Sequence, residues 1–117
     1  MVSKFQDNST IATRAYQAYL ILIGRAVNQQ TIQYLQLCEM MSYGRGPILS
    51  RPLGRIMDWC KREELPALTS IVVEKGTGIP STGLTTVEDN DFPTEQRRIF
   101  SFDWYSIIPP TLAELGP

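Results

Sequence analysis

One helical stripe constrains the fold of this 117-residue chain more than any other pattern. Between Ser9 and Asn28, large apolar side chains recur at steps of three and four residues, the period of one helix face. Ser9 and Thr10 are suited to cap this helix because both carry a hydroxyl that accepts backbone hydrogen bonds. Its middle is apolar on most sides, so we expect the helix to lie at the centre of the fold. The stripe consists of Tyr16, Tyr19, Leu20, Ile23 and Val27.

Two shorter helices are predicted to follow. The first begins at a Thr31 cap and ends near Met41, and residues 42–47 then form a turn-rich loop with two glycines and a proline. The next helix spans residues 50–64, with Pro52 in its first turn, where a missing N–H costs little. Its expected core stripe is Leu53, Ile56, Met57 and Cys60.

The second half of the chain predicts a small sheet. Residues 68–74 contain β-branched Ile71, Val72 and Val73, and a turn follows at residues 75–78. Aromatic residues alternate through 99–104, which predicts a second strand, and residues 79–93 are predicted to form a loop or wing. We therefore expect a single α+β domain over residues 1–117. It would be a three-helix, winged-helix-like fold with a small sheet, a flexible N-terminus at residues 1–8 and an acidic C-terminal extension.

The residue inventory excludes much chemistry. The chain has no histidine, so a Ser-His-Asp triad, a Cys-His dyad and a His-ligated zinc site are all excluded. Neither phosphate-binding glycine motif is present. The sequence therefore predicts no enzyme activity, no cofactor and no metal site.

The sequence also predicts the cellular compartment of the protein. The longest apolar run, residues 18–23, has six residues, whereas a membrane span needs about 20. The first residues show no secretory signal, and the two cysteines, Cys38 and Cys60, do not make a disulfide framework. We expect a cytoplasmic protein with no membrane partner.

Charge is distributed unevenly along the chain. Residues 42–62 contain five basic residues and one acidic residue, whereas residues 76–117 contain six acidic residues and two basic ones. Such asymmetry indicates an anionic partner for the basic part, or a solvated helix face whose charges pair with the acidic tail. Arg51, Arg55 and Arg62 are spaced to share one exposed side of the predicted third helix. A helix-turn-helix presents its recognition helix in this way.

The order of short motifs from Thr31 to Gly78 resembles the winged-helix domain of DNA alkyltransferases and of the non-catalytic alkyltransferase-like proteins. In that family a Thr/Ser-Tyr helix precedes an Ala-Arg-Ala-Val-Gly helix, and Pro-Cys-His-Arg-Val-Val then leads to a glycine turn. Here Arg51-Pro-Leu-Gly54 resembles the Arg-Ala-Val-Gly segment, and Val72-Val73 resembles the final Val-Val pair. Pro66 resembles the proline before the strand.

The sequence departs from the family at its reactive positions. Counting back from Val72 places Thr69 at the position of the reactive cysteine and Ser70 at that of the histidine. Alkyl transfer needs an activated thiolate, so the resemblance implies a non-catalytic DNA-binding relative. Ile32 falls at the position of the tyrosine that rotates the base, with Tyr34 two residues away.

Two functional hypotheses remain open. The first is a non-enzymatic DNA-binding module that touches the phosphate backbone through its third helix. The second is a small accessory subunit or inhibitor, of phage or bacterial type, that docks on a protein through its acidic, aromatic C-terminal segment. The predicted DNA contacts are Arg51, Arg55, Arg62, Arg45, Tyr43 and Tyr34, and the predicted protein contacts are Phe102, Trp104 and Tyr105.

Overall fold

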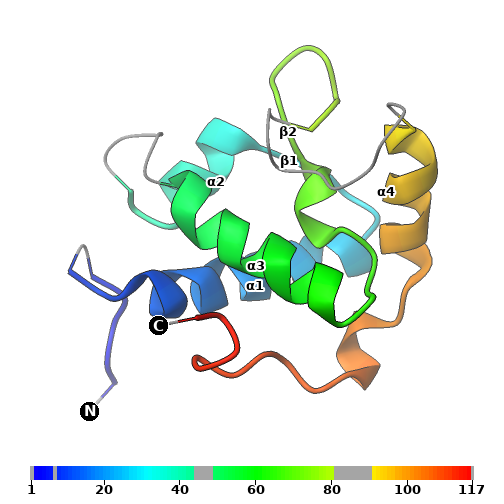
Figure 1. Cartoon of the computed structure of the whole chain (residues 1–117). Helices are drawn as coiled ribbons and strands as arrows, with labels where there is room; N and C mark the ends of the chain where they lie inside the picture. The colour runs from blue at the N-terminus through cyan, green and yellow to red at the C-terminus, as the bar shows by residue number, and fades with distance from the viewer. Residues whose placement is uncertain (1, 7, 44–48, 81–90, 117) are drawn as a thin grey trace.

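Helices dominate the computed structural model, which describes residues 2–6, 8–43, 49–80 and 91–116 (Figure 1). Four α-helices and one two-stranded parallel sheet lie within those ranges, so the predicted α+β class is confirmed. The elements in chain order are α1 (Ile11–Val27), β1 (Ile32–Gln33), α2 (Tyr34–Met40), α3 (Ser50–Arg62), the 3₁₀ turn η2 (Leu68–Ile71), β2 (Val72–Val73), α4 (Phe92–Ser101) and the 3₁₀ turn η3 (Trp104–Ser106).

Helix α1 forms at the predicted place and occupies the centre of the molecule. Thr10 is its N-cap, and the Thr10 hydroxyl accepts a hydrogen bond from the backbone N–H of Thr13 at 3.1 Å. Asn28 caps the other end, and the chain then turns through Gln29, whose φ is +56°. Helices α3 and α4 and both 3₁₀ turns pack against α1, which confirms the expected central helix.

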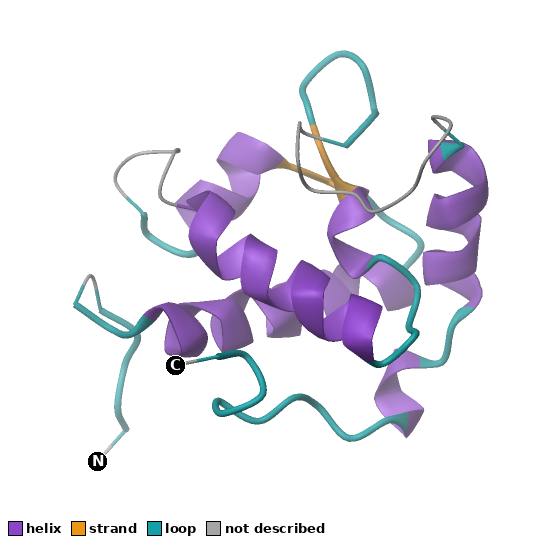
Figure 2. Ribbon diagram, viewed as in Figure 1, coloured by secondary structure: helices purple, strands orange, loops and turns teal. Residues whose placement is uncertain are grey.

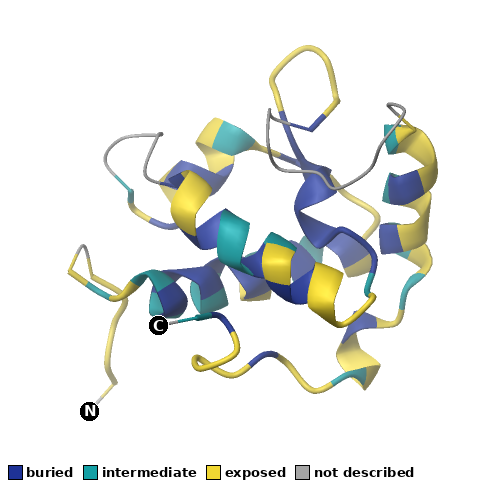
Figure 3. Ribbon diagram, in the orientation of Figure 1, coloured by how far each residue is buried: buried dark blue, intermediate teal, exposed yellow. Residues whose placement is uncertain are grey.

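Helix α3 crosses α1 with its apolar stripe facing inward. Leu53 and Ile56 are fully buried, and the Trp59 ring meets Tyr19 of α1 edge to face, with centroids 5.7 Å apart. The opposite side of α3 is the exposed band at the front of the molecule (Figure 3). The start of the predicted third helix is confirmed, and so are Leu53, Ile56 and Cys60 of its core stripe, but Met57 is only half-buried and Trp59 is buried instead.

The sheet differs from the predicted one. Ile32 pairs with Val72 and Gln33 with Val73, so the two strands are parallel (Figure 2). Thr31 is not the cap of α2, because β1 intervenes and Gln33 takes the cap position. The predicted strand over residues 68–74 shortens to two residues, since its first half is the buried turn η2.

The predicted strand at residues 99–104 is wrong, because this region ends α4 and begins η3. Pro93 lies in the first turn of α4, where its fixed φ favours a helix start. No β-strand follows β2 in the part of the chain that is described, so a strand-paired wing is not confirmed. Most of the loop expected at residues 79–93 lies outside the described residues, but Pro80 bridges back to Val73.

A buried carboxylate fixes α4 to the turn η2. Glu95 is only 6% exposed; its Oε2 accepts a hydrogen bond from the backbone N–H of Ala67 at 2.7 Å, and its Oε1 pairs with Arg98 at 2.7 Å. Gln96 adds a hydrogen bond from its side-chain amide to the backbone carbonyl of Ser70. Two adjacent α4 side chains therefore hold the backbone around η2.

Replacing this carboxylate should destabilise the fold by an amount that depends on the replacement. Glu95→Ala leaves the N–H of Ala67 without its acceptor, so we expect a loss of about 1–3 kcal/mol in the free energy of unfolding. Glu95→Gln keeps an acceptor oxygen and should cost less, and Arg98→Gln removes an exposed partner worth about 0–1 kcal/mol. Urea unfolding measures all three, and equal losses for Glu95→Ala and Glu95→Gln would contradict the role of the Ala67 bond.

Candidate nucleic-acid interface

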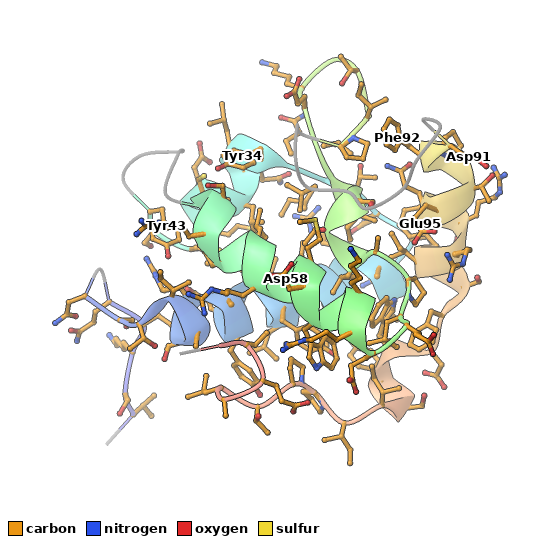
Figure 4. All side chains as sticks on the ribbon, viewed as in Figure 1. Tyr34, Tyr43, Asp58, Asp91, Phe92 and Glu95 are labelled. Atoms are coloured by element: carbon orange, nitrogen blue, oxygen red, sulfur yellow. The ribbon has the colours of Figure 1, made fainter. Side chains whose placement is uncertain are left out.

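The outward side of α3 forms a charged ridge, which we call the α3 ridge. Its side chains face away from α1 because the apolar positions of the same helix are buried against it. Figure 4 labels Asp58 near its centre, where it is the single acidic member. The α3 ridge consists of Arg51, Gly54, Arg55, Asp58, Lys61 and Arg62.

Gly54 leaves the middle of the α3 ridge without a side chain. A Cβ atom built on Gly54 would meet no other atom within 4 Å, so packing inside the described chain does not require a glycine there. Glycine inside a helix costs about 1 kcal/mol relative to alanine. A glycine that costs stability and serves no internal contact suits a place where an external partner approaches the helix backbone closely.

Tyr34 lies at the N-terminal end of the α3 ridge. It is the first residue of α2, is half-buried, and receives a hydrogen bond from the backbone of Ser50, where α3 begins. Burial raises the pKa of the Tyr34 hydroxyl, and the nearby Cys38 raises it further, while the Ser50 bond lowers it. The short segment β1 and the start of α2 thus place Tyr34 beside exposed Arg51. Ile32, which falls at the position of the family's base-rotating tyrosine, is buried in the sheet.

Tyr43 has a different environment from that of Tyr34. The guanidinium of Arg14, on α1, lies 4.1 Å from the centroid of the Tyr43 ring. One face of that ring is therefore already covered by a cation, and Tyr43 packs against the core. Arg45 falls outside the described residues.

The C-terminal segment contacts two of the three α3 arginines that were predicted to bind DNA. Arg55 Nη1 donates a hydrogen bond to the backbone carbonyl of Leu115 at 3.2 Å, and Arg62 Nη2 donates to the carbonyl of Glu114 at 2.5 Å. Arg51, Arg55 and Arg62 share the outward side of α3 as predicted, but Arg55 is half-buried there and the C-terminal segment contacts both Arg55 and Arg62. Of these three arginines, Arg51 has no hydrogen bond to the C-terminal segment among those described.

A pocket of about 430 Å³ lies where the C-terminal segment meets α3. The Trp59 indole N–H, at its edge, donates to the carboxylate of Glu114 at 3.4 Å. A charged pocket beside a basic helix is suited to anionic groups rather than apolar ligands. Its lining residues are Arg55, Asp58, Lys61, Arg62, Glu114, Leu115 and Gly116.

The predicted protein contacts separate into core and surface. Trp104 is 1% exposed and its indole N–H donates to the backbone carbonyl of Ile99 at 2.8 Å, so it is a core residue. Phe102 packs against Trp104 with ring centroids 4.6 Å apart. Tyr105, in contrast, is 65% exposed and remains available to a partner.

The side chains at the positions of the family's reactive residues are all buried. Thr69 and Ser70 are fully buried within η2. Burial raises the pKa of the Cys60 thiol to about 11 and also raises that of Cys38, which keeps both thiols protonated at neutral pH.

Across the described ranges there is no cluster of three or more potential metal ligands. Nor does any helix in those ranges have the length and apolarity to cross a membrane.

Protonation of Glu114 should weaken the contact between its carboxylate and Trp59 of α3. The N–H of Thr111 is the main cause that lowers the pKa of this exposed carboxyl below its usual 4.5, followed by the Trp59 indole. The bonds from Thr111 and Trp59 favour the carboxylate, so both are complete above the ordinary pKa and weaken as pH falls through the lowered one.

The Trp59 indole signal in an ¹H–¹⁵N NMR titration from neutral to acid pH reports this step. We expect a midpoint below 4.5, no such step in Glu114→Gln, and no matching shift of the Trp104 indole, which bonds a backbone carbonyl instead. A Trp59 signal that stays unchanged down to the acid unfolding of the protein would refute the contact.

Comparison of this chain with protein-family models, with curated proteins and with solved structures finds no match in any of the three. The resemblance to the winged-helix domain of DNA alkyltransferases therefore stays a hypothesis based on short motifs. The function has to be argued from the α3 ridge and its surroundings.

Proposed function

We propose that this protein is a non-enzymatic DNA-binding module, of winged-helix-like and alkyltransferase-like type, that contacts the phosphate backbone through α3. The observation that carries the proposal is the α3 ridge, where four cations surround a single acidic residue and an unneeded glycine. Arginine and lysine side chains on one helix face give affinity for phosphates. Gly54 lets a nucleic-acid backbone approach between Arg51 and Arg55 without a side chain in the way.

The neighbours of the ridge support the same proposal. Tyr34 stands beside Arg51 at the start of α3 and adds an aromatic, hydrogen-bonding group next to the cations. Asp91, Glu95 and Asp103 lie in or beside α4 and η3, and Glu114 is the acidic residue of the described second half that lies against the α3 ridge. Both cysteines are free and buried, which fits a reducing, cytoplasmic compartment.

The second hypothesis, docking on a protein partner, has one observation in its favour. Tyr105 and Ile108 are 65% and 87% exposed on the C-terminal segment, and exposed aromatic and aliphatic side chains favour protein contacts. DNA binding that weakens steeply with salt favours the first hypothesis, because phosphate contacts release counterions. A protein interface based on Tyr105 and Ile108 would depend little on salt.

Gly54→Gln should weaken DNA binding while it stabilises the protein. The new side chain has open space around it and raises helix propensity by about 0.5–1 kcal/mol, but it stands where the nucleic acid approaches. Gly24→Gln, in α1, is the matched control, because a Cβ at Gly24 also meets nothing within 4 Å and the residue is not on the α3 ridge. Fluorescence anisotropy with a labelled duplex of about 20 base pairs, at about 50 mM salt, measures the affinity.

A charge reversal on the same ridge completes this test. Arg51→Glu should weaken binding and make the log–log salt slope shallower by about 0.9 for each lost phosphate contact. Arg97→Glu changes the net charge equally on exposed α4, where Arg97 bonds Thr94, and should have a smaller effect. Unchanged affinity in both Gly54→Gln and Arg51→Glu, with the proteins folded by circular dichroism, would show that α3 is not the DNA contact.

A further inference from the structure

Residues 111–116 fold into a turn of their own, which we call the C-terminal turn. The Thr111 hydroxyl accepts from the N–H of Glu114, and the Glu114 carboxylate accepts from the N–H of Thr111 at 3.0 Å. These reciprocal bonds are the capping box that starts helical turns. The Leu115 N–H then bonds the Thr111 carbonyl, and Gly116 ends the turn with a φ of +97°. The C-terminal turn is thus shaped by its own residues before it touches α3.

The C-terminal turn docks on the α3 ridge by one apolar anchor and two carbonyls. Leu115 is 1% exposed, and the carbonyls of Glu114 and Leu115 receive the hydrogen bonds from Arg62 and Arg55. Gly116 suits this approach, because its φ of +97° is one that other residues rarely adopt and a Cβ there would displace the Arg55 guanidinium. In the cartoon, the red end of the chain returns to lie beside α1 and α3 (Figure 1).

We propose that the C-terminal turn is an autoinhibitory segment that competes with DNA phosphates for Arg55 and Arg62. The proposal rests on the proposed DNA-binding function of the α3 ridge. Two oxygen atoms of the turn stand at the donors that phosphate oxygens would use. The Glu114 carboxylate lies next to them and repels a phosphate by its like charge.

The same contacts allow DNA to displace the C-terminal turn. Both arginines bond neutral carbonyls in the docked state, and a charged phosphate oxygen is a stronger acceptor for a guanidinium. Leu115 is the one large apolar side chain of the turn that is buried, and a pocket of about 430 Å³ remains beside it. Docking of this kind lowers the affinity for DNA without abolishing it.

A simpler alternative is that the C-terminal turn only stabilises the fold by covering Trp59 and the end of α3. The two roles predict opposite signs. If the turn competes with DNA, loosening it strengthens DNA binding. If it only supports α3, loosening it leaves DNA binding unchanged or weaker and lowers stability.

The test uses substitutions that keep the net charge. Removing the Glu114 carboxylate would strengthen the attraction for DNA by charge alone, whether or not the turn competes with it. Leu115→Ser removes the buried anchor, and Gly116→Ala obstructs the approach to Arg55 with a single methyl group. Leu112→Ser is the matched control, since the same change falls on a side chain of the same turn that is 50% exposed. Each full-length variant is titrated with the labelled duplex used above, and its fold is checked by circular dichroism.

We expect Leu115→Ser and Gly116→Ala to bind DNA more tightly, by about tenfold for the loss of one buried leucine, while Leu112→Ser matches the natural chain. In a background with Arg55→Gln and Arg62→Gln, Leu115→Ser should no longer change the affinity, because the contested donors are gone. The Trp59 indole NMR signal should shift in Leu115→Ser, which reports undocking independently of DNA.

The outcomes distinguish this inference from the function on which it rests. Tight binding by the loosened variants and weak or no binding by the natural chain supports both. If the natural chain binds DNA and both folded, undocked variants bind it equally or less well, autoinhibition is overturned and the DNA-binding function stands. If neither the natural chain nor the variants bind DNA at low salt, both proposals fail.

Discussion

The packing of α3 across α1 decides which side chains this protein presents to its surroundings. Leu53 and Ile56 of α3 are fully buried against the central helix, and Trp59 meets Tyr19 edge to face. Residues three and four positions apart share one face of a helix, so burying this stripe places the arginines and the lysine of α3 on the opposite side. The α3 ridge is thus a consequence of core packing, and its cations need a partner in solvent, in DNA or in the chain itself.

The chain supplies part of that partner with its own last residues. The docked C-terminal turn places backbone oxygens at the donors of Arg55 and Arg62. The N-terminal end of the ridge carries Arg51 and Gly54 and lies next to Tyr34, and no described hydrogen bond joins it to the turn. The N-terminal half of the α3 ridge therefore faces outward, whereas the C-terminal turn contacts its C-terminal half.

Periodicity predicted where α1, α2 and α3 lie in the chain but not every buried position. In α1, Tyr19 and Ile23 of the predicted stripe are buried, whereas Leu20 and Val27 are exposed, because Leu22 and the small alanines face the core instead. Periodicity failed at α4, where Phe100, Phe102 and Trp104 alternate as in a strand, although Pro93 in the first turn favoured a helix. The helix ends between these aromatics, so their spacing spans a boundary and describes no single element. The parallel pairing of β1 with β2 was also missed, because two-residue strands carry no pattern long enough to recognise.

The candidate site was predictable in its charges and unpredictable in its contacts. Five basic residues within residues 42–62 located the basic helix correctly. The contact of Arg55 and Arg62 with the C-terminal turn joins residues more than fifty positions apart through backbone carbonyls, which no side-chain pattern encodes. The Thr111-x-x-Glu114 spacing is that of a capping box, but such a motif carries no information on where its turn docks.

An ¹H–¹⁵N NMR titration of the labelled protein with duplex DNA tests the central claim, that DNA and the C-terminal turn share the α3 ridge. The account predicts shifts at the amides of Arg51 and Gly54, together with movement of the Trp59 indole signal towards its position in the Leu115→Ser variant. The amide of Tyr105 should stay in place. Shifts confined to the region of Tyr105, or DNA binding that leaves the Trp59 signal in its docked position, would contradict the account.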